Sequence, residues 1–143
     1  MTEISFHINP PDPGAYPCRL LRKAVASGAR LVVTGQAEQL AVLDEALWTF
    51  SPMDFIPHCF TRGDALVLEA SPVVLADLSG APISGLPHHQ VLVNLGDQVP
   101  TGFESFERLI EIVGGSESEL QAARRRWRHY ADRGYAPVRH QLA

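Results

Sequence analysis

The stretch Arg30–Phe50, RLVVTGQAEQLAVLDEALWTF, joins a short apolar run to an amphipathic segment. Arg30–Thr34 predicts a strand covered on both faces, because its apolar residues do not alternate with polar ones. Gly35 predicts a turn, and Ala37–Phe50 predicts a helix whose apolar stripe is Leu40, Leu43, Leu47 and Phe50. A strand that passes into a helix through so short a turn is typical of an α/β fold.

The flanking segments extend this pattern in both directions. A strand is expected at Ile4–Ile8, where apolar and polar residues alternate, and a helix at Cys18–Ser27. Gln90–Leu95 predicts a further strand. Weaker strand signals lie at Phe55–His58, Leu66–Ala70 and Val73–Leu75; most of Ser71–Pro87 reads as loop, and Phe103–Val113 reads as an amphipathic helix. Alternating strands and helices with short connections predict a parallel sheet in one α/β domain spanning residues 1–143.

Composition narrows the class of protein. The chain has 143 residues, of which 45% are hydrophobic and 20% charged, as in an ordinary globular protein. It has neither an apolar run of about 18 residues nor a signal-peptide pattern, so we expect no membrane segment. Two cysteines without an export signal favour reduced thiols in a cytoplasmic protein. The net charge of −4 argues against a protein that coats nucleic acid.

Charge is unevenly distributed along the chain. Residues 124–143 hold six arginines and one acidic residue, a formal charge of +5, whereas the preceding 123 residues carry −9. The basic residues begin inside Ser116–Tyr135, which predicts a helix. Ser116 with Glu119 fits a capping box, and Gly134 fits the residue after the helix end. A confined basic segment in an acidic protein predicts a negatively charged ligand.

The aromatic residues of this helix suggest what that ligand is. Leu120, Ala123, Trp127, Tyr130 and Gly134 step by three and four, so this stripe is expected to face inward. Arg124 and Arg128 flank it, one turn apart and beside Trp127. Such a set suits a carboxylate with an apolar neighbour, because arginine binds carboxylates with two parallel hydrogen bonds. Phosphate with a stacked base would use the same groups, and the sequence leaves both possibilities open.

Motifs for catalysis and cofactors are weak. The turn Val33–Glu38 has one glycine where a dinucleotide site needs three, and neither a P-loop nor a G-x-S-x-G nucleophile elbow is present. His88-His89 and His58-Cys59 are adjacent pairs whose side chains do not converge as metal ligands or as nucleophile and base. We expect neither an enzyme nor a metal or cofactor site.

Trp48 and Phe55 form a second candidate surface. Trp48 lies beside the apolar stripe of its helix rather than on it, and the turn after the helix could bring Phe55 close. The two aromatics either seal the helix end against the sheet or anchor a protein partner.

Two blocks of sequence resemble the chi subunit of bacterial DNA polymerase III. The first is LDEALW (Leu43–Trp48) followed by Phe55-Ile56-Pro57-His58. The second is the terminal pattern formed by Arg124, Tyr130, Gly134 and Tyr135. The resemblance runs from the first strand to the last helix, and leaves Ser71–Pro87 and Ala136–Ala143 unmatched. It implies a Rossmann-like three-layer domain that has no cofactor and leaves catalysis to other subunits.

The resemblance also implies membership of the clamp-loader complex and two partners. One is the acidic C-terminal tail of single-stranded-DNA-binding protein, which by motif position would bind Arg124 and Trp127, with Val113, Arg128 and Gly134 as neighbours. The other is the psi subunit, where one exists, on Trp48 and Phe55. DNA would then be contacted only indirectly, and no membrane would be involved. Direct binding of single-stranded nucleic acid by the basic helix is the alternative.

Overall fold

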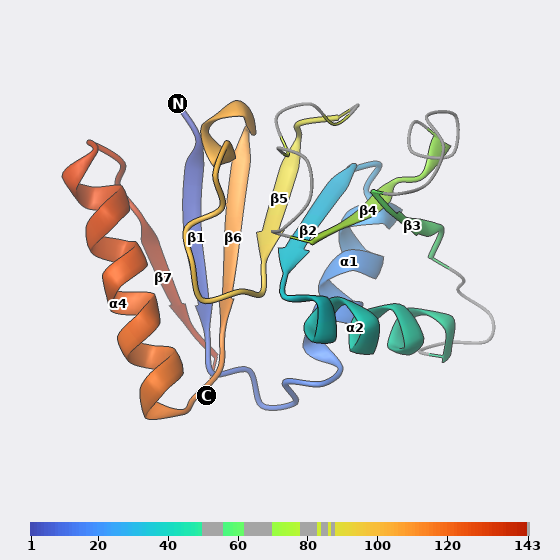
Figure 1. The fold of residues 1–143 in the computed structure, drawn as a ribbon, viewed down its shortest axis with the longest axis horizontal. Helices are drawn as coiled ribbons and strands as arrows, with labels where there is room; N and C mark the ends of the chain where they lie inside the picture. The colour runs from blue at the N-terminus through green and yellow to red at the C-terminus, as the bar shows by residue number, and fades with distance from the viewer. Residues whose placement is uncertain (50–55, 62–69, 78–82, 84–85, 87, 143) are drawn as a thin grey trace.

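The computed structural model describes residues 1–49, 56–61, 70–77, 83, 86 and 88–142 (Figure 1). Within these residues, seven parallel strands form one sheet in the order β3-β4-β2-β5-β6-β1-β7. The strands are β1 (Glu3–Ile8), β2 (Leu31–Gly35), β3 (His58–Phe60), β4 (Val73–Asp77), β5 (Val91–Asn94), β6 (Arg108–Val113) and β7 (Val138–Gln141). The α-helices within the described residues are α1 (Tyr16–Ala26), α2 (Ala37–Thr49) and α4 (Glu117–Asp132). The predicted α/β class is confirmed, and Rossmann-like describes it well.

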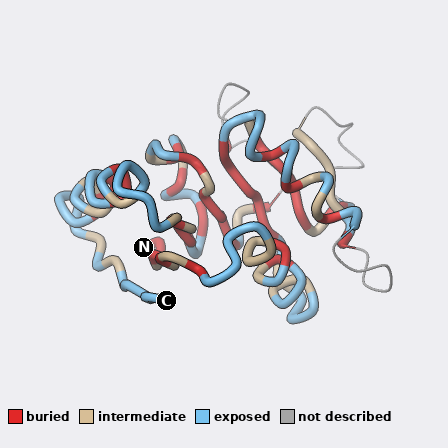
Figure 2. Tube along the Cα trace, turned by 90° about the horizontal axis from the view of Figure 1, so that it is seen from below, coloured by how far each residue is buried: buried red, intermediate tan, exposed pale blue. Residues whose placement is uncertain are grey.

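Helices cover both faces of the sheet. Successive residues of β2 point to opposite faces, so Val32 packs in one core cluster and its neighbours Leu31 and Val33 in the other. The Val32 cluster includes residues of α4, and the other cluster includes residues of α1 and α2. Figure 2 shows the buried strand segments enclosed by exposed helical turns. The result is three layers, with α4 beside β1 and β7 at one end of the sheet (Figure 1).

The stretch around β2 and α2 folds as the sequence predicts. All five residues of β2 are buried, as expected for a strand covered on both faces. The α2 stripe residues Leu40, Leu43 and Leu47 are buried, whereas Phe50 lies outside the described residues. The strands expected at Ile4–Ile8 and Gln90–Leu95 appear as β1 and β5, and the helix expected at Cys18–Ser27 appears as α1.

The prediction of a helix at Phe103–Val113 is wrong. The segment forms one 3-10 turn, Phe103–Ser105, and then strand β6. β6 lies between β5 and β1, where Leu109 pairs with Leu92 and Ile4. A strand buried on both faces has apolar residues at successive positions. Over so short a run these mimic helical spacing, and periodicity cannot distinguish the two.

Other boundaries differ less. β4 extends through Val73–Asp77 in a region read mostly as loop, and β3 begins at His58, where the predicted strand ended. Most of the strand expected at Leu66–Ala70 lies outside the described residues. β7 was not expected from the sequence at all. It pairs with β1 from Ser5↔Val138 to Ile8↔Gln141, and it borders the candidate site.

Candidate functional site

Helix α4 has defined ends. Ser116 caps it, because its Oγ accepts a hydrogen bond from the Glu119 N–H at 3.3 Å and donates one to Glu119 Oε1 at 2.8 Å. At the other end Gly134 has φ of +88°, and the Tyr135 N–H donates to the Tyr130 carbonyl at 3.1 Å. The predicted cap at Ser116 and the predicted helix end at Gly134 are therefore confirmed, and the Glu119 carboxylate contacts the Ser116 hydroxyl. Closed ends fix which residues of the basic run belong to the helix.

The inner face of α4 is held by a buried polar network. Arg126 Nε lies 3.1 Å from Glu111 Oε1 on β6, as an ion pair without the alignment of a hydrogen bond. Arg126 Nη1 donates to the Asp97 carbonyl at 3.1 Å. Asn94 Nδ2 donates to Glu111 Oε1 at 2.8 Å, and the Tyr130 hydroxyl donates to Glu111 Oε2. These contacts fix the rotation of α4 about its own axis.

Burial sets the protonation of this network. It raises the pKa of Glu111 above the ordinary carboxyl value, and the nearby Arg126 guanidinium opposes that rise. Burial and the neighbouring Glu111 also raise the pKa of Tyr130, so its phenol remains a hydrogen-bond donor at neutral pH. The network is enclosed on the core side of α4, and its role is to orient the helix.

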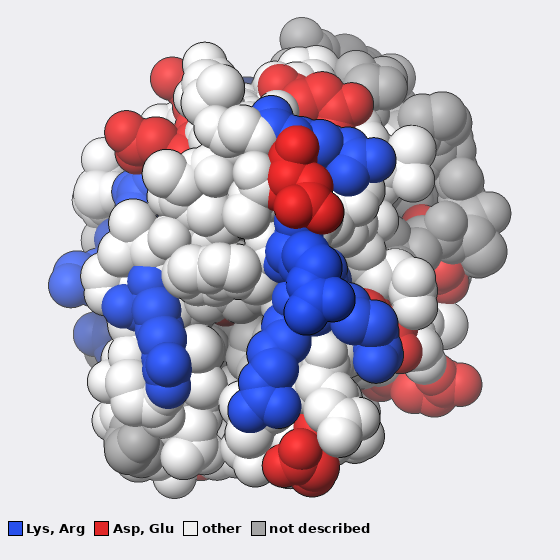
Figure 3. All heavy atoms as spheres, turned by 90° about the vertical axis from the view of Figure 1, so that its left-hand side faces the viewer, with Lys and Arg blue, Asp and Glu red and all other residues white. Residues whose placement is uncertain are grey.

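The side of α4 that faces β1 and β7 borders an open groove of about 490 Å³. Two residues of β1, Phe6 and Ile8, lie at its base. The remaining lining residues are Leu120, Ala123, Arg124, Trp127, Arg128 and Ala131 from α4 and Arg139 from β7. Figure 3 shows several Lys and Arg side chains on this end of the molecule, with uncharged surface between them. Three residues predicted from sequence, Arg124, Trp127 and Arg128, therefore share one groove.

Trp127 contributes to both the core and the groove. Its side chain is partly buried, and its ring centroid lies 5.1 Å from that of Phe6, with the planes tilted by 47°. Phe6 is itself fully enclosed, so one part of the Trp127 ring is fixed by the core. The stripe predicted to face inward therefore includes Trp127 only in part. A half-buried indole gives the groove a rigid apolar wall.

The guanidinium of Arg124 is accessible to a ligand. Its Nη1 lies 3.9 Å from Glu117 Oε1, and the two side chains are 69% and 73% exposed. An ion pair this exposed contributes little free energy, so a ligand carboxylate can displace it at low cost. The Arg128 side chain is also exposed and lies one turn further along the helix.

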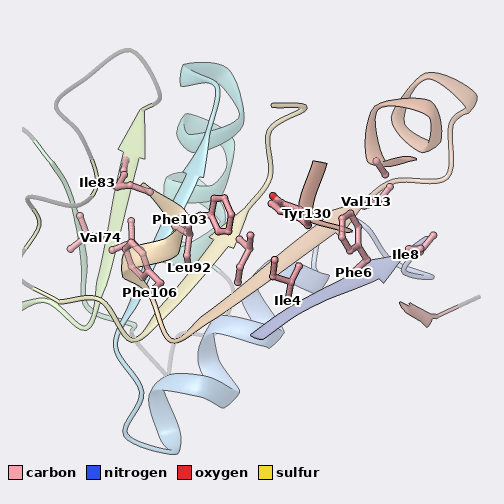
Figure 4. Close-up of a cluster of buried hydrophobic side chains, with 14 residues drawn as sticks. Ile4, Phe6, Ile8, Val74, Ile83, Leu92, Phe103, Phe106, Val113 and Tyr130 are labelled. Atoms are coloured by element: carbon pink, nitrogen blue, oxygen red, sulfur yellow. The ribbon is translucent and has the colours of Figure 1, made fainter. Parts of the chain in front are cut away.

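Two other residues expected near the ligand do not line the groove. Val113 is 2% exposed and packs in the core, where it pairs in register with Ile8 (Figure 4). Gly134 is the exposed residue that ends α4. Their expected contact with a ligand stays a prediction.

Sequence reasoning missed Phe6, Ile8 and Arg139 as lining residues of the groove. The alternation of β1 could have found the first two, since it places both on one face.

Trp48 lies far from this groove, near the end of α2. It is 58% exposed, and its ring contacts the His58 ring edge-on at a centroid distance of 5.3 Å. His58 Nε2 in turn lies 2.8 Å from Asp44 Oδ1. Trp48 therefore rests on an ordered neighbour while much of its surface is open. Phe55 lies outside the described residues, so its expected pairing with Trp48 stays a prediction.

Within the described residues, no group of three or more His, Cys, Asp or Glu side chains is arranged to hold a metal ion. No described helix is long and apolar enough to cross a membrane.

Comparison with known families gives the context of the groove. The sequence model of the family "DNA polymerase III chi subunit, HolC" matches residues 1–138. The chain belongs to the DNA polymerase III chi subunit family. This membership confirms the resemblance seen in the LDEALW block and in the arginine-aromatic helix. It indicates an accessory subunit of DNA replication that acts within the polymerase III holoenzyme.

Two curated relatives support the assignment to the chi family. The chain is 34% identical to the DNA polymerase III subunit chi of Pseudomonas aeruginosa, over 99% of this chain and 98% of the relative. It is 26% identical to the DNA polymerase III subunit chi of Haemophilus influenzae, over 82% of this chain and 79% of the relative. The family match ends at Val138, one residue before Arg139.

Proposed function

We propose that this chain is a non-catalytic subunit of the clamp-loader complex that links the psi subunit to the acidic C-terminal tail of single-stranded-DNA-binding protein. The observation that carries the proposal is the groove in which Arg124 and Arg128 flank the half-buried ring of Trp127. Family membership supports the replication context, and the groove supplies the chemistry for a carboxylate-ended tail.

The groove matches such a tail in shape and polarity. Its volume of about 490 Å³ lies in the range of pockets that enclose a small ligand. Leu120, Trp127 and Ala131 keep accessible apolar surface for a terminal phenylalanine, and the buried Phe6 and Ile8 lie beneath them. The guanidinium groups of Arg124 and Arg128 can bind the terminal carboxylate with charge-assisted hydrogen bonds.

Direct binding of single-stranded nucleic acid is the competing function. It would need cations that follow the backbone over several nucleotides. Here the basic residues gather at one groove, while the first 123 residues carry a formal charge of −9. That distribution favours a short acidic ligand over a phosphate chain.

Calorimetric titration with a synthetic acidic peptide ending in a phenylalanine with a free carboxylate tests the tail. Arg124→Ala should weaken binding by about 1.5–3 kcal/mol, or about 10- to 150-fold, because a charge-assisted contact is lost. Amidating the peptide terminus should have a similar effect. Arg125→Ala is the matched control, because Arg125 is exposed on the same helix outside the groove lining.

Unchanged affinity for both Arg124→Ala and the amidated peptide would overturn the proposal. Micromolar binding of an oligonucleotide with a steep salt dependence, together with no peptide binding, would favour the nucleic-acid alternative.

The psi subunit is assigned to the surface around Trp48. This residue lies at the β3–β4 end of the sheet, away from α4, so both partners can bind at once (Figure 1). An exposed tryptophan whose ring is ordered by His58 has the character of an interface anchor.

A pull-down with the psi subunit tests this surface. Trp48→Ala should weaken capture strongly, as hot-spot truncations cost about 2 kcal/mol or more, while the unfolding transition stays close to that of the unmodified chain. Val42→Ala, at a 69% exposed position on the same helix, is the control. Severe unfolding of Trp48→Ala would instead favour a sealing role, and unchanged capture would remove psi from this surface.

A further inference from the structure

One cation of the groove comes from a different element than the others. Arg139 lies on β7, whereas Arg124 and Arg128 lie on α4. We infer that Arg139 is a ligand-binding residue that pairs with an acidic side chain preceding the terminal carboxylate of the bound peptide. This inference rests on the proposed function of the groove.

The strand register sets the direction of Arg139. It pairs with Phe6 of β1, and neighbouring residues in parallel strands point to the same face of a sheet. Phe6 faces α4, where it contacts Trp127. Val138 and His140 point to the opposite face, and His140 contacts His7 there. Of these three residues of β7, only Arg139 therefore points toward the groove.

A local contact holds the Arg139 side chain at this face. Arg139 Nη2 donates a hydrogen bond to Gln141 Oε1 at 2.8 Å. Gln141 pairs in register with Ile8, which also lines the groove. The guanidinium is thus steadied over the β1 side of the groove and keeps further N–H donors for a ligand.

The placement of the three cations restricts the ligand. Arg124 and Arg128 lie on the α4 wall of the groove, and Arg139 lies on the strand wall. The partly exposed apolar side chains of Leu120 and Trp127 lie between them. A terminal residue carries a single carboxylate. If α4 binds that group, the cation of β7 is matched only when the ligand has a second negative charge. The fitting ligand class is a peptide with an apolar C-terminal residue and an acidic residue shortly before it.

A different explanation for Arg139 is protection of a sheet edge. All four residues of β7 are exposed, and charged side chains on edge strands discourage pairing with other chains. That role predicts that removing the charge leaves peptide affinity unchanged. The two explanations therefore separate in one binding experiment.

The experiment uses the full chain and two peptides that both end in phenylalanine with a free carboxylate. One has aspartates before the phenylalanine, and the other has asparagines in their place. Arg139→Gln should weaken the aspartate peptide by about fivefold, as expected for one charge pair at the rim of a site, and should leave the asparagine peptide almost unaffected. Arg139→Lys should restore most of the affinity, and Arg125→Gln is the control for overall charge.

Equal weakening of both peptides by Arg139→Gln, or no weakening of either, would overturn the inference. Amide hydrogen exchange of residues 138–141 shows whether β7 stays in place in the Arg139→Gln variant. Unchanged exchange indicates a lost charge contact, and faster exchange indicates a displaced strand. The proposed function fails separately, when Arg124→Ala and amidation leave binding unchanged. If Arg124→Ala weakens binding and Arg139→Gln does not, the groove binds the tail without help from β7.

Discussion

Two arginines separated by one residue on α4 have opposite surroundings. Arg124 is exposed and lines the groove, whereas Arg126 is 4% exposed and lies against Glu111 and the Asp97 carbonyl. Each helical residue advances about 100° around the axis, so residues two apart point to nearly opposite faces. A run of three arginines in a helix of this kind therefore cannot act as one basic surface. The net charge of the segment alone therefore overstates the number of cations that a ligand can contact.

The two sites also differ in energetics. Arg126 and Glu111 have left water, and each compensates the other's charge in the core. Arg124 and Glu117 remain in solvent, where their attraction is weak. Loss of a buried partner leaves an uncompensated charge, whereas loss of an exposed partner leaves a hydrated one. The buried arginine should matter for folding and the exposed one for binding.

Arg126→Ala provides the largest test of this difference. It should lower the free energy of unfolding by about 3–5 kcal/mol, because Glu111 then stays buried without its cation. Urea denaturation with linear extrapolation measures the change. Arg124→Ala is the matched variant on the same helix and should change the free energy of unfolding by less than about 0.5 kcal/mol.

Adding Glu111→Gln to Arg126→Ala should restore part of the lost stability, because the unpaired charge is then removed. Equal destabilisation by Arg124→Ala and Arg126→Ala would contradict the division between a structural and a binding arginine.

Much of the fold could be predicted because its central pattern is local. The apolar run of β2 and the stripe of α2 lie within one continuous stretch, and their order indicates a parallel sheet. β6 could not be predicted, since its apolar residues on both faces have no distinct period. β7 could not either. Its residues are all exposed, and they form a strand only because β1 offers a free edge.

The candidate site shows the same division. Arg124, Trp127 and Arg128 are one helical turn apart or less, so spacing was enough to group them. Arg139 joins them through strand pairing, which spacing does not contain. The burial of Arg126 also depends on a distant residue, Glu111. One local signal did exist. Ala122, Arg126 and Tyr130 step by four, and all three are buried on the inner face.

A smaller effect is the pH dependence of the loss in unfolding free energy caused by Arg126→Ala. Burial raises the pKa of Glu111 above its ordinary 4.5, and loss of the Arg126 guanidinium should raise it further. The folded state then holds the Glu111 proton more tightly than the unfolded chain does. Acidification within the window above pH 4.5 therefore favours the folded state, and more so in the variant.

The difference in unfolding free energy between Arg126→Ala and the unmodified chain should accordingly shrink as the pH is lowered from 8 toward 5, within about the range where a raised carboxyl pKa titrates. Groups that titrate alike in both proteins cancel in this difference. With Glu111→Gln as the common background, the same comparison should be flat across that range. A penalty that grows on acidification would mean that Glu111 is not the group that Arg126 compensates, and that α4 is oriented by packing alone.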